Sequence, residues 1–205
     1  QGNVDPDTAI DRLGRFREGF NIRQRKNELY SGGENLFKLP VTDYPEIPVT
    51  SKELTLCENL FGLYTDVIAS IDQWKQLTWS QVLPMVEDML GAMEGYSGRV
   101  KRQPKKVREF PGFLTARDKI EEFQVVLPMI QELSKASIRT RHWEAVLKIM
   151  HQPKSAEEIE QWLDSVTFQE LLDMEMHHKE EDIVDVTDMA DKELKIENDK
   201  AEIVD

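Results

Sequence analysis

The chain has 205 residues, of which 40% are hydrophobic and 32% are charged, and its net charge is −13. One cysteine excludes an intrachain disulfide, and no run of about 20 apolar residues is present that could cross a membrane. This composition is typical of long amphipathic helices, which bury one stripe and expose the rest. No initiator methionine or secretory signal is visible, and the single cysteine favours a reducing compartment, so we expect an intracellular segment. Because the last predicted helix reaches residue 205 without a stop signal, we expect it to be cut from a longer polypeptide.

The acidic excess lies in the last quarter of the chain. Residues 1–153 contain 21 acidic and 21 basic residues, whereas residues 154–205 contain 18 acidic and 5 basic ones. An acidic balance disfavours nucleic acid and anionic membranes, so we expect neither as a partner. A solvated helix face is the simplest explanation of the acidic residues, and docking onto a basic partner is the alternative.

The first predicted element is a helical segment over residues 1–33. Asp5-Pro6-Asp7 combines an N-cap candidate with a proline in the first turn. Apolar residues then recur at spacings of three and four: Ile10, Leu13, Phe16 and Phe20. Gly32-Gly33 predicts the end of the helix, and lacks the Gly-Lys-Ser/Thr ending of a phosphate-binding loop.

Residues 34–50 are expected to form an extended strap. Pro40, Pro45 and Pro48 interrupt short apolar groups, which disfavours a helix. The apolar side chains are too numerous for a free linker, and we expect them to pack across neighbouring helices: Leu36, Phe37, Leu39, Tyr44 and Ile47.

Residues 51–153 are expected to form a helical bundle. Its clearest helix follows Ser51 and carries a seam of the coiled-coil a/d type: Cys57, Leu60, Tyr64, Val67, Ile71 and Trp74. The next helix is expected over residues 81–94, capped by Ser80 and ended by Gly95.

Two more helices complete the predicted bundle. They are expected over residues 113–137, with a kink or break at Pro128, and over residues 138–150. Between the second and third helices, residues 99–108 are strongly basic. Without interleaved aromatic residues, this stretch favours a solvated loop or a surface for an acidic partner over nucleic-acid binding.

Residues 154–205 are expected to be an acidic helical segment. Ser155 and Glu158 form a capping box, and a final helix shows no stop signal before residue 205. The whole pattern predicts an all-α fold, an elongated helical bundle with a proline-containing strap.

No pattern in the sequence indicates catalysis, a cofactor or a metal. Cys57 lies on the predicted seam, as a small buried hydrophobe would, and has no nearby partner for nucleophilic chemistry. His177 with Glu181, and His178 with Asp182, lie one helical turn apart, but two ligands do not make a metal site.

The cluster Arg141-His142-Trp143 is the strongest local candidate for an interaction site. A tryptophan beside two polar side chains is either an anchor with bonded neighbours or an ordinary core residue with exposed ones. Both interpretations remain open at this point.

Several stretches together resemble the start of the linker region of dynein heavy chains. Leu29-Tyr30-Ser31-Gly32-Gly33-Glu34-Asn35-Leu36-Phe37-Lys38-Leu39-Pro40 and Tyr44-Pro45-Glu46 come first, followed by Leu60-Phe61-Gly62-Leu63-Tyr64, Trp74 and Trp79. Leu127-Pro128-Met129-Ile130, Arg141-His142-Trp143 and Ala190-Asp191-Lys192-Glu193-Leu194-Lys195-Ile196-Glu197 complete the set. The motif Gly-Gly-Glu-Asn-Leu-Phe resembles that of axonemal heavy chains more than that of cytoplasmic ones.

The resemblance implies a segment that joins the last tail helix, residues 1–33, to the first part of the linker. The parent would be an ATP-driven, minus-end-directed microtubule motor of the ciliary or flagellar axoneme, with ATP and Mg²⁺ bound beyond residue 205. The implied partners are the rest of the heavy chain, including its ATPase ring, and neighbouring heavy, intermediate or light chains, with microtubules contacted only through the parent.

The mechanical role that the resemblance implies needs helices held at fixed angles. We expect Arg141 and His142 to fix one helix junction, so that strain is transmitted through it. The rival hypothesis is a stand-alone helical scaffold or adaptor that binds a basic partner.

Overall fold

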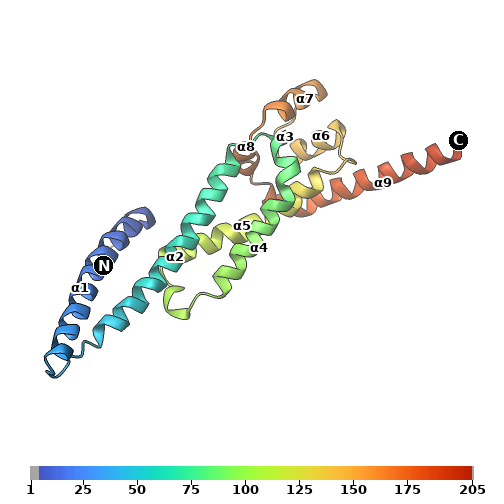
Figure 1. Cartoon of the computed structure of the whole chain (residues 1–205). Coiled ribbons are helices and arrows are strands. Elements are labelled where there is room, and N and C mark those ends of the chain that lie inside the picture. The colour runs from blue at the N-terminus through green and yellow to red at the C-terminus, as the bar shows by residue number, and fades with distance from the viewer. Residues whose placement is uncertain (1–4, 205) are drawn as a thin grey trace. The chain divides into compact units, whose positions relative to one another are not determined.

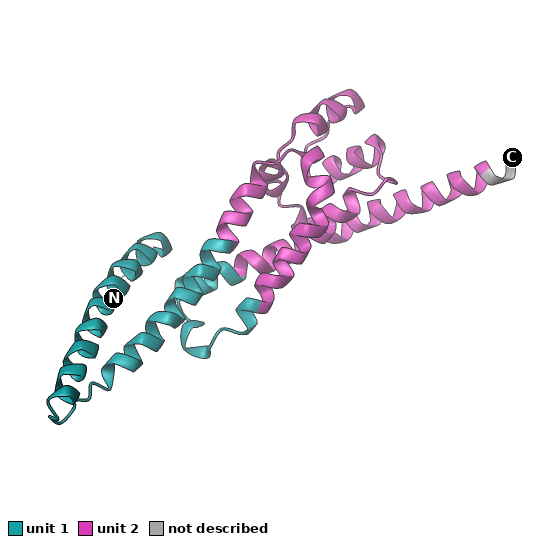
Figure 2. Ribbon diagram, viewed as in Figure 1, with its two compact units in different colours: residues 1–66, 99–117 teal, residues 67–98, 118–205 magenta. Residues whose placement is uncertain are grey.

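The computed structural model describes residues 5–204, and helices account for most of them (Figure 1). The predicted all-α fold is thereby confirmed. The chain divides into two compact units, one of residues 1–66 and 99–117 and the other of residues 67–98 and 118–205 (Figure 2). No helix within the described residues is both long and apolar enough to cross a membrane.

Unit 1 contains a hairpin of two helices. Helix α1 (Pro6–Leu36) begins at Asp5, whose carboxylate accepts hydrogen bonds from the N–H groups of Asp7 and Thr8. The first part of α2 (Glu46–Lys75) returns alongside it (Figure 1). Arg17 joins the two helices by donating two hydrogen bonds of 2.6 Å to the carboxylate of Glu58.

The remainder of unit 1 packs on α2. The turn η2 (Lys105–Val107) and the start of α5 (Pro111–Leu133) place Val107 and Phe113 against Leu60 in a small buried cluster. The basic residues 99–108 surround this turn and are partly neutralised, because Arg99 pairs with Asp66 at 2.6 Å and Lys106 with Glu53 at 2.5 Å.

The boundaries predicted around the strap are wrong. Helix α1 continues through Gly32-Gly33 to Leu36, and α2 begins at Glu46 with Pro48 in its first turn. The extended stretch is therefore residues 37–45, with a left-handed residue at Lys38 (φ 57°). Glycine inside a helix costs only about 1 kcal/mol, and proline is tolerated in a first turn, so neither residue stops a helix by itself.

The strap residues also differ from the prediction in their burial. Leu36, Phe37 and Tyr44 were expected to pack across neighbouring helices, but 77%, 74% and 49% of their surfaces are exposed. Leu36 and Phe37 are thus mostly exposed, and Tyr44 is about half covered, beside Asn27 and Tyr30 of α1.

Unit 2 is built from short and long helices that follow one another closely. They are the last part of α2, α3 (Trp79–Val82), η1 (Leu83–Met85), most of α4 (Val86–Lys101), the later part of α5, α6 (Thr140–Ile149), α7 (Ala156–Ser165), α8 (Phe168–Asp173), η3 (Met176–Lys179) and α9 (Glu180–Val204). The capping box at Ser155 and Glu158 is confirmed. The end predicted at Gly95 is wrong, since α4 continues to Lys101, and Pro128 lies inside α5 without ending it.

Two N-capping threonines hold the middle of unit 2 together. Thr78, which takes the place predicted for Ser80, begins α3, and Thr167 begins α8. The two residues lie opposite each other in an isolated antiparallel bridge, where Trp79 N–H donates to the Val166 carbonyl at 2.9 Å and Phe168 N–H to the Leu77 carbonyl at 2.8 Å. The first N–H group of each helix thus donates to the carbonyl of the residue that precedes the N-cap of the other.

The continuation of α1 through its glycines predicts the effect of a substitution there. Gly32 has an open site for a Cβ and no left-handed backbone angle. We therefore expect Gly32→Ala to raise the helix content seen by circular dichroism and to stabilise α1 by about 0.5–1 kcal/mol. Destabilisation by the same substitution would show that Gly32 is a left-handed C-cap and that α1 ends before it.

Candidate functional site

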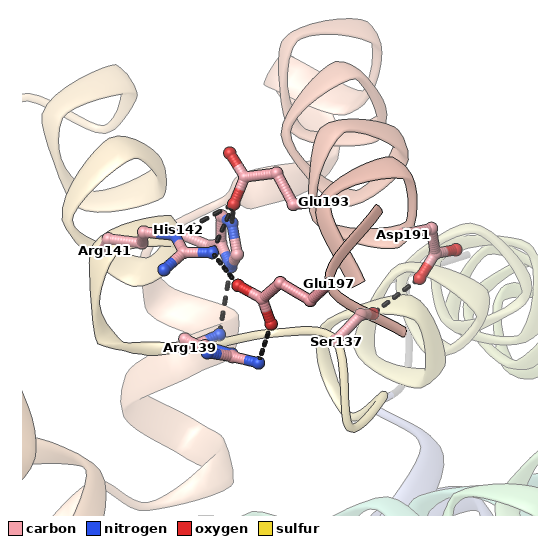
Figure 3. Close-up of polar contacts among 7 residues, drawn as sticks. All are labelled: Ser137, Arg139, Arg141, His142, Asp191, Glu193 and Glu197. Atoms are coloured by element: carbon pink, nitrogen blue, oxygen red, sulfur yellow. Dashed lines mark hydrogen bonds and ion pairs between the residues drawn. The ribbon is translucent and has the colours of Figure 1, made fainter. Parts of the chain in front are cut away.

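The start of α6 and the middle of α9 meet in a charged junction within unit 2. Arg139, Arg141 and His142 lie on the α6 side, and Glu193 and Glu197 face them from α9 (Figure 3). These are two of the stretches in the resemblance, about 50 residues apart in sequence. We call these five residues the α6–α9 junction.

His142 is the buried centre of the junction, with 4% of its surface exposed. Its Nδ1 accepts a hydrogen bond from the backbone N–H of Arg139 at 3.0 Å, and its Nε2 lies 3.2 Å from a carboxylate oxygen of Glu193. Since Nδ1 accepts, neutral imidazole carries its proton on Nε2 and donates it to Glu193. One side chain therefore both caps α6 and bonds to α9.

Arginine side chains surround this histidine on the exposed side. Arg141 donates from Nε to Glu193 at 2.9 Å, and its Nη2 contacts both Glu193 and, at 3.5 Å, Glu197. Arg139 pairs with Glu197. The guanidinium of Arg141, and then the His142 ring, lower the pKa of the Glu193 carboxyl. Folding therefore favours ionised Glu193, so its contribution to stability is present at neutral pH and is lost as the pH falls through the lowered pKa.

A second polar contact lies one turn earlier on α9. Ser137, which is buried in the connection before α6, donates to a carboxylate oxygen of Asp191 at 2.5 Å (Figure 3). Lys135 binds the other oxygen at 3.0 Å. The Ser137 hydroxyl and then Lys135 lower the pKa of Asp191. Three successive carboxylates of α9 are thus bonded to the chain that leads into α6.

Trp143 anchors the same junction from inside. It is 3% exposed, and its ring meets the rings of Trp79 and Trp162 edge-on, with centroids 5.3 and 5.6 Å away. Edge-to-face aromatic pairs contribute about 0.5–1.5 kcal/mol beyond the burial of their area. Trp143 is thus a core residue, and its neighbours Arg141 and His142 are bonded within the same unit.

The structure separates the remaining candidates. Trp74 is buried in unit 2, where its ring lies 6.1 Å from that of Phe123. Leu36, Phe37 and Tyr44 belong to unit 1, whereas the α6–α9 junction belongs to unit 2.

Sequence reasoning did not assign the α9 carboxylates to the site. The stretch containing Glu193 and Glu197 was part of the resemblance, but periodicity alone does not reveal a partner 52 residues away. Nor is the acidic segment simply a solvated face, because Asp191, Glu193 and Glu197 pair with side chains of the same unit.

The other residues considered for catalysis or metal binding give weaker evidence of a functional site. Burial raises the pKa of the Cys57 thiol, which disfavours the reactive thiolate. The rings of His177 and His178 in η3 lie close together but tilted, with centroids 4.1 Å apart and an angle of 48° between their planes. Within residues 5–204, no three His, Cys, Asp or Glu side chains are grouped so that they could hold a metal ion.

The junction and its tryptophan anchor define an all-α bundle segment whose last helix is held by a polar network. Residues 47–205 match the model of the family described as dynein heavy chain, N-terminal region 2. Over 95% of its length, the chain is 38% identical to the dynein gamma chain of the flagellar outer arm of Chlamydomonas reinhardtii. It is 29% identical, over 99%, to human dynein axonemal heavy chain 8, and 25% identical, over 98%, to rat dynein axonemal heavy chain 5.

The chain therefore belongs to the dynein heavy chain family, and the resemblance found in the sequence is confirmed. It spans 4% of the length of the first two relatives and 6% of the third.

The two bonds of His142 predict a graded response to substitution. His142→Ala removes the cap, the bond to Glu193 and buried contacts, and should lower the free energy of unfolding by about 1–3 kcal/mol in urea titrations. His142→Gln offers an acceptor to the Arg139 N–H, as glutamine does in a capping box, and should recover part of the loss.

Glu144→Ala, at an exposed position of the same helix, is the matched control and should have little effect. If His142→Gln were as destabilising as His142→Ala, the cap would not be the source of the stability.

Proposed function

We propose that this chain is the tail-to-linker segment of an axonemal dynein heavy chain and acts as a mechanical element between the tail and the ATPase ring. Membership of the heavy chain family supports its place in such a motor. The α6–α9 junction is the observation that carries the mechanical role, because it fixes the long helix α9 against the short helix α6 through several bonds at once.

A lever must hold its helices in one register under load. The apolar face of α9 packs through Ile183, Val186 and Ala190, which are buried. Apolar packing between helices tolerates small slides, whereas hydrogen bonds and ion pairs lose their geometry within about 1 Å. The carboxylates of Asp191, Glu193 and Glu197 therefore supply the register that the apolar face lacks.

Stability and register are carried by different groups in this proposal. Partly exposed ion pairs such as Arg141–Glu193 usually contribute less than about 1 kcal/mol each. The buried Trp143 contributes more to stability through its contacts with two other tryptophans. Substitution of an ion-pair residue should therefore leave the fold intact and still weaken the fixed position of α9 against α6.

The same proposal assigns the chemistry and the contacts to the longer parent chain. ATP and Mg²⁺ would be bound in the parent's ATPase ring, and this segment would hold no cofactor. Its partners would be the rest of the heavy chain and neighbouring heavy, intermediate or light chains, with microtubules reached only through the parent. The flagellar and axonemal names of the relatives support a location in the cilium or flagellum.

The mechanical role predicts a split between movement and ATP turnover. In the intact heavy chain, Arg141→Ala should reduce the speed of microtubule gliding by about twofold or more and leave the basal ATPase rate nearly unchanged. Microtubule gliding and ATPase assays on the same purified motor measure both quantities.

Lys148→Ala is the matched control, since Lys148 is an exposed cation of the same helix and should affect neither rate. Trp143 is left in place because its removal would damage the core. Equal loss of gliding and ATPase activity, or loss of neither, would contradict the role.

A further inference from the structure

Helix α1 exposes an apolar stripe that the described residues of the chain leave uncovered. Ile22, Leu29 and Leu36 are spaced by seven residues, which is close to two helical turns, so they lie in one row. Their surfaces are 52%, 72% and 77% exposed. A row of this spacing is the pattern by which one helix packs along another.

The stripe does not face α2. The side of α1 toward α2 carries Arg17, bound to Glu58, and Phe20, the buried residue of this helix. Asn27 lies on that side too, and its Oδ1 is buried without a hydrogen-bond partner among the described residues. Helical geometry places Ile22 and Leu29 about half a turn away from Phe20 and Asn27. The inner face of α1 thus packs on α2 through apolar and polar residues, and the second half of its outer face carries a separate apolar row.

Two glycines open the outer face to close approach. Gly32 and Gly33 lie between Leu29 and Leu36, and a Cβ added at either would meet no atom within 4 Å. Another helix could pack its side chains against the backbone here. The cations Arg25 and Lys26, both exposed, flank the row and favour acidic residues on whatever covers it.

Size and sequence position together indicate the occupant. Three side chains cover far less than the roughly 800 Å² per partner of a stable complex between separate proteins. A segment of the same polypeptide needs less, because the connecting chain raises its effective concentration. The family match begins at residue 47, so α1 precedes the matched region, and the relatives are far longer than this chain.

We propose that the outer stripe of α1 binds an amphipathic helix of the same heavy chain, from the part that precedes region 2. That helix has an apolar row for Ile22, Leu29 and Leu36 and carboxylates beside it for Arg25 and Lys26. The hairpin of α1 and α2 is then one side of a bundle that the preceding helix completes.

Site-specific photo-crosslinking in the intact heavy chain tests the proposal. A benzophenone amino acid replaces Leu29, the purified motor is irradiated, and crosslinked peptides are identified by mass spectrometry. The expected product joins position 29 to a heavy-chain peptide that precedes this segment, at a yield several-fold above that from position 11. Asp11 is the control, because it is an exposed, charged position of the same helix that lies outside the row of Ile22, Leu29 and Leu36.

A crosslink to another polypeptide, or to a part of the heavy chain that follows this segment, would overturn the proposal. Equal yields at positions 11 and 29 would overturn it as well, since they would show a solvent-exposed helix. A second measurement is limited proteolysis of the intact motor: Leu29→Glu should increase cleavage within residues 37–45 several-fold, whereas Asp11→Asn should not.

Discussion

The hydrogen bonds of His142 to the backbone of Arg139 and to the carboxylate of Glu193 are the constraint on which the end of unit 2 depends. The first bond determines where α6 begins, and the second places α9 against it. Because the same ring makes both, a shift of α9 along α6 breaks the bond to Glu193 or pulls the ring away from the Arg139 N–H. The surrounding ion pairs then resist rotation of α9 about its axis.

The arrangement separates two requirements that a load-bearing segment must meet. The buried aromatic residues, Trp143 with Trp79 and Trp162, supply cohesion that is insensitive to small displacements. The partly exposed ion pairs of the α6–α9 junction supply little net free energy, because their partners are well solvated when apart. They specify a register instead, a use of polar groups that is well established in packed helices.

Sequence patterns predicted the elements of this fold better than their ends. The heptad seam of α2 and the capping box at Ser155 depend on neighbours within one or two turns, so they are visible in the sequence. The helix ends predicted from Gly32-Gly33 and Pro48 were wrong because the effects of these residues on a helix are small enough for the surrounding residues to override. The burial predicted for Leu36, Phe37 and Tyr44 was wrong because apolar character alone does not say whether a neighbouring helix lies close enough to cover a side chain.

The sequence predicted one side of the candidate site but not the other. Arg141, His142 and Trp143 were recognisable as an unusual local cluster, but the carboxylates that they bind lie about 50 residues later on a helix rich in acid. Any of several aspartates and glutamates of α9 could have faced them, and periodicity does not choose between the candidates. The choice is made by the path of the intervening helices α7 and α8, which tertiary contacts fix and local propensity does not.

The most direct measurement is the distance between α6 and α9 in solution. Spin labels at Lys148→Cys and Lys195→Cys, in a chain carrying Cys57→Ser, report that distance by pulsed electron resonance, and both positions are exposed. If the junction sets the register, the unaltered pair gives one narrow distance distribution, and Glu193→Gln with Glu197→Gln broadens or shifts it while the helix content stays the same. An identical narrow distribution in both proteins would show that apolar packing alone places α9, and would contradict the register-setting role of the junction.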